Sequence, residues 1–229
     1  MSVAHLRPVT FAHERLLPVA APLAPLLPHA GLPRGGSVAI AGGAGLSSVA
    51  LALVAEASRL GSWVAIAGWQ SVGLTAAAEL GVALDRVVVV DVDPERFGSV
   101  VAALVDAVDI VVARPPRSLA TSVARRLAAR ARERGAVIVL AGRAAGPIVV
   151  GAFDPLARIE VRASTWIGLE AGHGTLRARR LTIEASVRRD GRPRRATVWI
   201  PGPDGGVGAV DAADVVPDMT IAPVPAASA

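Results

Sequence analysis

Short apolar runs alternate with longer segments whose apolar residues recur at helical spacing, between residues 35 and 140. The apolar runs lie at 38–41, 63–67, 86–91, 109–113 and 136–140, and the intervening segments 47–60, 75–80, 94–108 and 118–134 suit helices. These runs are apolar throughout, which is typical of parallel strands covered on both faces. The order therefore predicts an α/β fold with a parallel sheet flanked by helices.

A different period begins after residue 180. Leu181, Ile183, Ala185 and Val187 alternate with polar residues, as in a half-buried antiparallel strand. Asp190-Gly191 then predicts a hairpin turn, and 196–200 a returning strand. We therefore expect a mixed sheet with a C-terminal antiparallel β extension.

Composition changes divide the chain into three parts. Residues 1–30 predict an extended Pro-rich segment, whose close prolines exclude a long helix but whose leucines can dock on the core. Residues 31–200 form the core with its C-terminal hairpin. Residues 201–229 contain four aspartates and no arginine, which indicates a flexible acidic tail. This tail can lie on the arginine-rich hairpin of its own chain or bind a partner.

Overall composition narrows the function classes. The chain has 229 residues, is 52% apolar, and contains no cysteine, so disulfides and thiolate–metal sites are excluded. His5, His13 and His29 lack metal-ligand spacing, and we expect no metal or cofactor. The uncharged run 35–55 holds five glycines and three serines, which favours strand, loop and helix over a membrane span. The N-terminus shows no secretory pattern, so we expect a cytoplasmic protein with no membrane partner.

A glycine-rich loop follows the first predicted strand. It resembles the phosphate-binding pattern G-x-x-x-x-G-K-[ST], and its residues are Gly42, Gly43, Gly45, Leu46, Ser47 and Ser48. The lysine position is Leu46, and all 24 basic residues of the chain are arginines. We favour a tight strand-to-helix turn over residual nucleotide binding, with Ser47-Ser48 capping the helix.

Acidic residues follow the strand at 86–90. Asp91, Asp93 and Glu95 lie where ligands bind in α/β folds, so a metal or ribose contact is one interpretation. The order Asp93-Pro94 is more consistent with an N-cap followed by proline at the first helical position.

The arginines form two clusters, and the net charge of +5 favours a polyanionic partner only where arginines gather. Around the helix at 118–134, Arg125, Arg126 and Arg132 can face an acidic partner or a nucleic acid, while Glu133 is expected to pair with Arg126 and Arg130.

The second cluster comprises Arg177, Arg179, Arg180, Arg188, Arg189, Arg192, Arg194 and Arg195. Five of these lie within eight residues at the hairpin turn, which suits contacts to nucleic-acid phosphates. A solvated hairpin explains them equally well. Trp166 and Trp199 could stack on bases, but we expect both to be buried.

Several segments together resemble the RecA-like recombinase core, over roughly residues 23–198. They are Leu-Pro-Arg-Gly at 32–35, the glycine loop, Ala-Glu-Leu-Gly-Val at 78–82 and Val-Asp-Ile-Val-Val at 108–112. The segment from Trp166 to Leu181, leading into the arginine-rich hairpin, is similar to the ImuA family of RecA-like accessory proteins in the bacterial damage-induced mutasome, in particular its actinobacterial form.

The resemblance implies a degenerate ATP site. The phosphate lysine of the family falls on Leu46, the glutamate that orients the attacking water on Trp69, and the acid that helps to hold magnesium on Ala113. Because alkyl and indole groups cannot hold magnesium or orient water, we expect a pseudo-ATPase and not an enzyme.

The resemblance also implies partners. These are an ImuB-like inactive Y-family polymerase and, through it, an error-prone C-family polymerase and the sliding clamp, in translesion synthesis after DNA damage. DNA binding and homo-oligomer formation stay open. The alternatives are a recombinase-like ATPase and a SulA-like inhibitor of cell division.

Overall fold

The computed structural model describes residues 16–142, 146–170 and 173–210. Its described part contains a sheet of nine strands in the order β11-β10-β9-β8-β3-β7-β6-β4-β5. The strands are β3 (Ser37–Gly42), β4 (Val64–Ala67), β5 (Val87–Val90), β6 (Ile110–Ala113), β7 (Val137–Ala141), β8 (Ala157–Glu170), β9 (His173–Val187), β10 (Arg194–Trp199) and β11 (Gly208–Ala209). The helices are α1 (Leu46–Arg59), α2 (Leu74–Glu79), α3 (Phe97–Ala107), α4 (Thr121–Arg134) and α5 (Gly146–Ala152).

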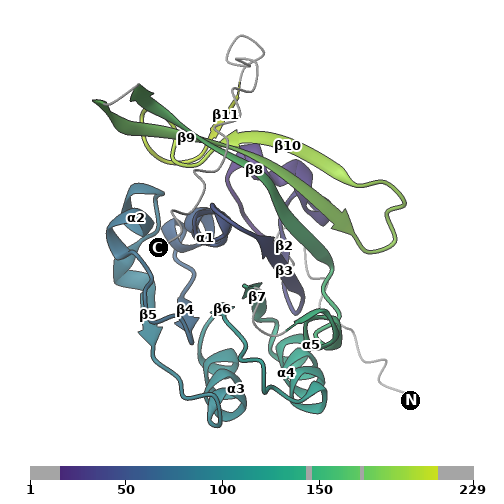
Figure 1. Cartoon of the computed structure of the whole chain (residues 1–229). Helices are drawn as coiled ribbons and strands as arrows, with labels where there is room; N and C mark the ends of the chain where they lie inside the picture. Colours follow the sequence, from purple (N-terminus) through teal and green to yellow (C-terminus); the bar gives the residue numbers. More distant parts are fainter. Residues whose placement is uncertain (1–15, 143–145, 171–172, 211–229) are drawn as a thin grey trace, which may run out of the picture.

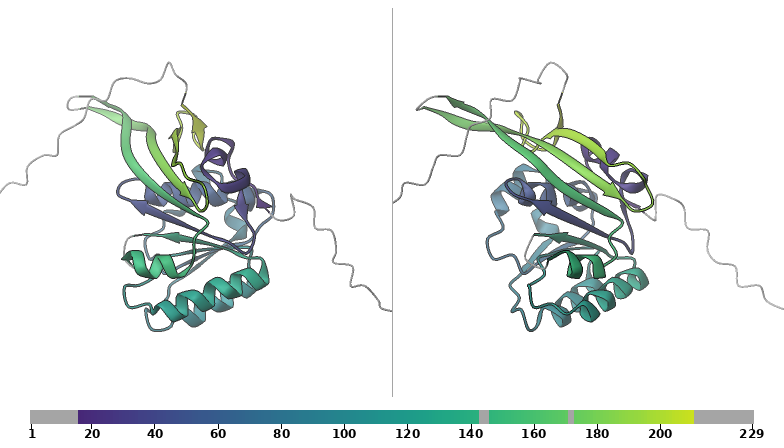
Figure 2. Two further views of the ribbon diagram at one scale, coloured as in Figure 1. Left: turned by 90° about the vertical axis from the view of Figure 1, so that its right-hand side faces the viewer. Right: turned by 45° about the vertical axis from the view of Figure 1, so that its right-hand side comes forward.

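The sheet is parallel from β8 to β5 and antiparallel from β8 to β11. Helices α1 and α2 lie over one face of the parallel part, and α3, α4 and α5 lie over the other (Figures 1 and 2). Successive residues of β6 and β7 belong to the two cores in turn, so these strands are apolar on both faces. The predicted α/β fold with a mixed sheet and a C-terminal antiparallel extension is confirmed.

Strand β5 departs from the expectation of complete burial. Val88 and Val89 are exposed because β5 is the last strand of the sheet and pairs only with β4. An apolar run therefore marks a strand here, but not a buried one.

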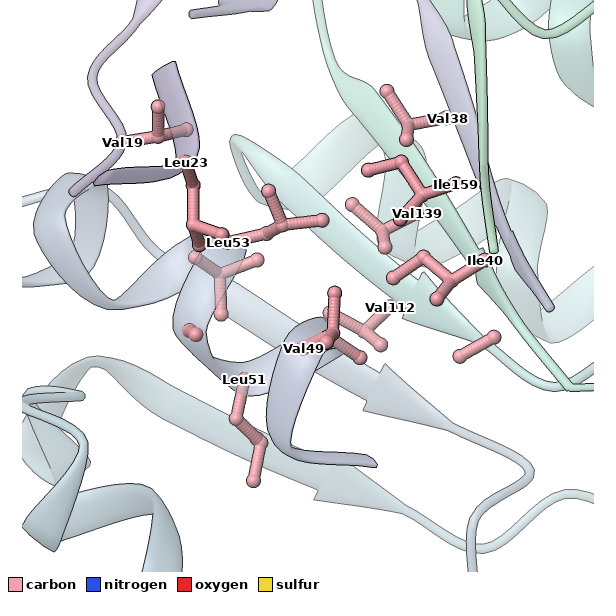
Figure 3. Packing of buried hydrophobic residues seen from close by; sticks show 14 of the residues in the cluster. Val19, Leu23, Val38, Ile40, Val49, Leu51, Leu53, Val112, Val139 and Ile159 are labelled. Atoms are coloured by element: carbon pink, nitrogen blue, oxygen red, sulfur yellow. The ribbon is translucent and has the colours of Figure 1, made fainter. Parts of the chain in front are cut away.

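Helix α1 is the centre of the larger core. Ten of its fourteen residues are buried, because the sheet covers one side and the N-terminal segment covers another. Figure 3 shows Leu53 next to the N-terminal Leu23 and Val49 next to Val112 of β6, all within one apolar cluster.

The N-terminal segment is folded and not extended along residues 21–30. It forms two 3-10 helices, Ala21–Leu26 and Pro28–Ala30, and Leu23, Leu26 and Leu27 are fully buried. Proline fixes a φ angle that suits such tight turns, and these turns direct the leucines into the core. A short pairing of β1 (Leu16–Leu17) with β2 (Leu32–Pro33) closes the segment on itself.

The C-terminal hairpin is longer than its alternating pattern predicts. Strand β9 begins at His173, eight residues before the predicted start, and pairs with the unpredicted β8. Residues 173–177 are exposed, so neither face of the strand is buried there and apolar and polar residues need not alternate. In Figure 1 the β8–β9 hairpin crosses above α1, and β8 continues beyond the residues that pair with β3.

The predicted tail boundary at residue 201 is wrong for residues 201–210. This stretch returns to the sheet, where β11 pairs with the end of β10. The rest of the predicted acidic tail, residues 211–229, lies outside the described residues, as do His5 and His13. Within the described ranges, no helix has the length and apolar character needed to cross a membrane.

Candidate functional site

The glycine loop between β3 and α1 is packed against the β8–β9 hairpin. Gly45 has a φ of 105°, and a Cβ atom there would lie 2.9 Å from Cδ2 of Leu181. A Cβ atom on Gly42 would lie 2.9 Å from the carbonyl oxygen of Val161. Both glycines are therefore required by the backbone and by close packing within the chain.

The two serines after the loop do not cap the helix, contrary to the prediction. Helix α1 begins at Leu46 with Gly45 as its N-cap residue and no side-chain cap. Ser47 and Ser48 thus lie within the first helical turn, too late for the capping position. The Ser48 hydroxyl instead accepts a hydrogen bond from Arg179.

Arg179 is a buried cation beside the glycine loop. Only 8% of this residue is exposed, and its Nε donates a hydrogen bond of 3.0 Å to the carbonyl oxygen of Ile200. Its guanidinium also lies 4.8 Å from the centre of the Trp166 ring. Burial lowers the pKa of Arg179 below its ordinary value. The expectation that Arg179 contacts nucleic acid is therefore wrong, because its guanidinium already bonds protein groups.

The two tryptophans of this region have different environments. Trp199 is buried as expected, whereas Trp166 is 40% exposed. Trp166 lies on the part of β8 that extends beyond the pairing with β3, so one side of its ring meets Arg179 and the rest meets solvent.

The other two degenerate positions lie at the carboxyl edge of the parallel sheet. Trp69 follows β4 and Ala113 ends β6, which is the neighbour of β4. Both are buried, as is Leu46, and the Arg114 guanidinium lies 5.1 Å from the centre of the Trp69 ring. No group of three or more His, Cys, Asp or Glu side chains that could hold a metal occurs among the described residues.

The acids after β5 do not cap α3 as predicted. Helix α3 begins at Phe97, its N-cap residue is Arg96, and no side chain caps it. The backbone N–H of Arg96 bonds the carbonyl oxygen of Asp93, so residues 94–96 form a turn ahead of the helix. Asp91 accepts a hydrogen bond of 3.0 Å from the backbone N–H of Val92.

Ion pairs on α4 differ from the expected pattern. Asp106 of α3, and not Glu133, bonds Arg130, and it also pairs with Arg134 at 3.0 Å. The three arginines singled out by the sequence, Arg125, Arg126 and Arg132, are exposed and form no ion pair within the described part of the chain. They leave α4 with uncompensated positive charge.

Nearby carboxylates compensate part of the second cluster. Arg188 pairs with Asp154, Arg194 with Asp190 at 2.8 Å, and Arg195 with Glu184 at 2.8 Å. Arg194 also donates to the carbonyl oxygens of Pro25 and Leu27. Arg177, Arg189 and Arg192 are exposed, and Arg180 is half-buried.

The two clusters meet at the amino edge of the sheet, around Asp154. Arg34, Arg132 and Arg188 line a hollow of about 230 Å³ with Asp154. The hydrogen bond from Arg188, with the charges of Arg132 and Arg189, lowers the pKa of Asp154. Sequence reasoning did not identify Arg34 or Asp154, because no local pattern indicates that α4 and the hairpin turn are neighbours.

Comparison with known proteins gives two findings. Residues 25–146 match the profile of a family described as the MT3502 N-terminal domain. The chain is 34% identical over 106 residues to the uncharacterised protein Rv3395c of Mycobacterium tuberculosis. The aligned stretch covers 46% of this chain and 51% of that relative. The chain thus spans about half the length of the curated relative it matches. The family match includes the glycine loop and α4 and ends before the β8–β9 hairpin.

Proposed function

We propose that this chain, which belongs to the MT3502 N-terminal domain family, is a non-catalytic RecA-like accessory protein in DNA-damage-induced translesion synthesis. It acts as an adaptor through protein–protein contacts and holds DNA without reading its sequence. The resemblance of the segments at 32–35, 78–82, 108–112 and 166–181 to RecA-like and ImuA proteins supports the proposal.

The proposal that the protein is not an ATPase rests on the residues at three positions. A RecA-like ATPase needs a lysine or a carboxylate at each of them. Leu46, Trp69 and Ala113 are all buried, and the side chains of Leu46 and Ala113 contain no polar atom. The one polar atom among them, the Trp69 indole N–H, is a donor only and cannot bind a cation.

One side of the loop is also covered by the chain itself. Leu181 packs where a side chain on Gly45 would lie, and Arg179 bonds Ser48 in the first turn of α1. In a working phosphate loop these groups would have to leave space for the ligand. A recombinase-like ATPase is therefore the weaker alternative.

The partners follow from the resemblance to ImuA. We propose that the chain binds an ImuB-like inactive Y-family polymerase and, through it, an error-prone C-family polymerase and the sliding clamp. Exposed arginines at the hairpin turn, Arg188, Arg189, Arg192 and Arg195, supply the DNA contacts in this proposal.

The test is capture of partners by the tagged full chain from cells with damaged DNA. Recovery of the inactive Y-family polymerase relative, absent from a tag-only control, is the expected result. Recovery of a cell-division protein in its place would favour the SulA-like alternative and overturn the proposal.

A second arm of the same test measures ATP hydrolysis by the purified chain with magnesium. We expect none, and none from the Leu46→Lys variant, because Trp69 and Ala113 still cannot orient water or hold magnesium. Hydrolysis that the Gly45→Glu substitution abolishes would contradict the non-catalytic assignment.

A further inference from the structure

We propose that a single arginine groove at the amino edge of the sheet binds the sugar–phosphate backbone of a nucleic acid. The arginine groove is lined by Arg34, Arg125, Arg132 and Arg188. This inference rests on the proposed DNA contacts and deepens them. It gives the strand a path that joins the hairpin turn to helix α4.

Two adjoining hollows form the groove. One of about 230 Å³ lies between the start of β3, the end of α4 and the start of β8, and Arg34 and Arg188 line it. The other, of about 460 Å³, lies between α4 and α5 and is lined by Arg125. Ala128, Arg132 and Asp154 line both hollows, so the two lie next to each other.

The charge in the groove is positive. Arg125 and Arg132 form no ion pair within the described residues. Arg34 pairs with Asp109 at 2.9 Å and Arg188 pairs with Asp154, which orients both guanidinium groups and leaves further N–H donors on each. Asp154 is the one carboxylate among the residues that line the two hollows.

Part of the groove permits close approach of a backbone. Gly151 has only the Arg158 guanidinium within 4 Å of a Cβ position, at 3.8 Å, whereas Gly35 and Gly36 are packed against Arg132 and Leu156. A guanidinium fork bonds phosphate oxygens in a bidentate manner, and small residues let the phosphate come near.

The groove lacks exposed aromatic groups that would stack on bases. Phe153 is the one aromatic residue among its lining, and it is buried under the floor at 2% exposure. Proteins that track single strands by stacking use exposed aromatic rings. We therefore expect phosphate contacts without sequence preference.

An acidic protein is the competing occupant. Ile148, which is 78% exposed, is the one large apolar side chain at the α4–α5 end that such a partner could bury. A single exposed apolar residue gives little contact area, whereas the arginines run the length of the groove, so the polynucleotide is favoured.

The experiment measures binding of a fluorescent oligothymidylate, and of a duplex of unrelated sequence, to the full chain by anisotropy at several salt concentrations. One variant removes the α4 side of the groove, Arg125→Ala with Arg132→Ala. The other removes the turn side, Arg188→Ala with Arg189→Ala. The control, Arg96→Ala with Arg117→Ala, removes two exposed arginines that line neither hollow and form no ion pair with described residues.

Each groove variant is expected to raise the Kd about tenfold and to reduce the slope of log K against log salt by roughly two, and the control to change neither. Asp154→Asn removes the groove's carboxylate and is expected to tighten binding several-fold, a gain that partial unfolding cannot produce.

The outcomes separate this inference from the proposed function. If the turn variant weakens binding and the α4 variant does not, the groove is overturned while DNA contact by the hairpin stands. Equal losses in the control overturn the groove as well, because they indicate diffuse charge. If the unmodified chain binds neither oligonucleotide, both the groove and the proposed DNA contact fail. Loss of a protein partner in the α4 variant at unchanged oligonucleotide affinity assigns the groove to an acidic protein.

Discussion

Arg179 connects helix α1 with the consecutive antiparallel strands of the C-terminal extension. From β9 it bonds the Ser48 hydroxyl of α1 and the Ile200 carbonyl oxygen after β10, and its guanidinium faces the Trp166 ring of β8. A buried cation is costly unless polar groups satisfy it. These contacts fix the position of the hairpin over the glycine loop.

Replacement of Arg179 by Met tests this role. The Met side chain keeps the stem volume but leaves the Ser48 hydroxyl and the Ile200 carbonyl oxygen without their donor. We expect the free energy of unfolding, measured by urea denaturation, to fall by about 1–3 kcal/mol. Arg177→Met, two residues earlier on the same strand and exposed, is the matched control and should stay within about 0.5 kcal/mol of the unmodified chain. Equal effects of the two would refute a special role for Arg179.

The proposed lack of ATPase activity rests on residue identities that the sequence shows directly. Leu46, Trp69 and Ala113 place neither a lysine nor a carboxylate at the three positions that the resemblance singles out. Their burial, and the contacts of Arg179 and Leu181 with one side of the loop, could not be predicted, because both depend on which strand crosses above the loop.

Helices α3 and α4 form the tightest helix pair of the smaller core. A Cβ atom on Gly98 of α3 would lie 2.7 Å from Cγ1 of Val123 on α4. Asp106 near the end of α3 holds Arg130 and Arg134 of α4. Close packing near one end and an ion-pair cluster near the other align the two helices.

The ion-pair cluster predicts a pH dependence. The hydrogen bond from Arg130 is the main cause that lowers the pKa of Asp106 from 3.8 to about 2. A carboxyl group with a lowered pKa in the folded state stabilises the fold above its unfolded pKa, and this contribution is lost as the pH falls through the folded pKa. Asp106→Asn should therefore be less stable than the unmodified chain at pH 7, and the difference should shrink between about pH 4 and pH 2.

Urea midpoints measured across that range check the expectation. Asp85→Asn is the control, since Asp85 is 79% exposed and lies 3.7 Å from Arg86. A difference between Asp106→Asn and the unmodified chain that does not change with pH would count against the ion-pair cluster as its source.

Strands and helices were predictable where one or both faces are buried, because burial imposes a regular spacing of apolar residues along the chain. The strands at 109–113 and 136–140 and the helix at 118–134 coincide with β6, β7 and α4 to within three residues at either end. The predicted caps at Ser47-Ser48 and Asp93 were wrong, because α1 begins at Leu46, before both serines, and α3 begins only at Phe97.

At the scale of the whole molecule, the N-terminal segment completes the core. Leu23, Leu26 and Leu27 are fully buried in the cluster that includes α1 and the sheet. A domain boundary at residue 30 therefore cuts through one hydrophobic core.

Truncation of Leu26 to Ala measures that contribution. A fully buried leucine that is replaced by alanine leaves a cavity, and we expect the free energy of unfolding to fall by about 2–5 kcal/mol. Leu60→Ala, at a residue that is 63% exposed, should cost less than about 0.5 kcal/mol. Equal and small effects would mean that the segment is not part of the cooperative unit.

The glycine loop and the arginine groove lie at opposite edges of the parallel sheet. The glycine loop, Trp69 and Ala113 lie toward the carboxyl ends of the parallel strands, whereas Arg34 and Asp154 lie beside the start of β3.

The sequence by itself determined the α/β class, the order of the central elements, the missing lysine and the two arginine clusters, because periodicity and residue identity are local properties. Only the tertiary structure decided that Arg179 is buried over the glycine loop and that Arg132 meets Arg188 at Asp154. The reason is physical: these neighbours are set by strand order and by the length of the β8–β9 hairpin, which depend on packing between residues distant in the chain.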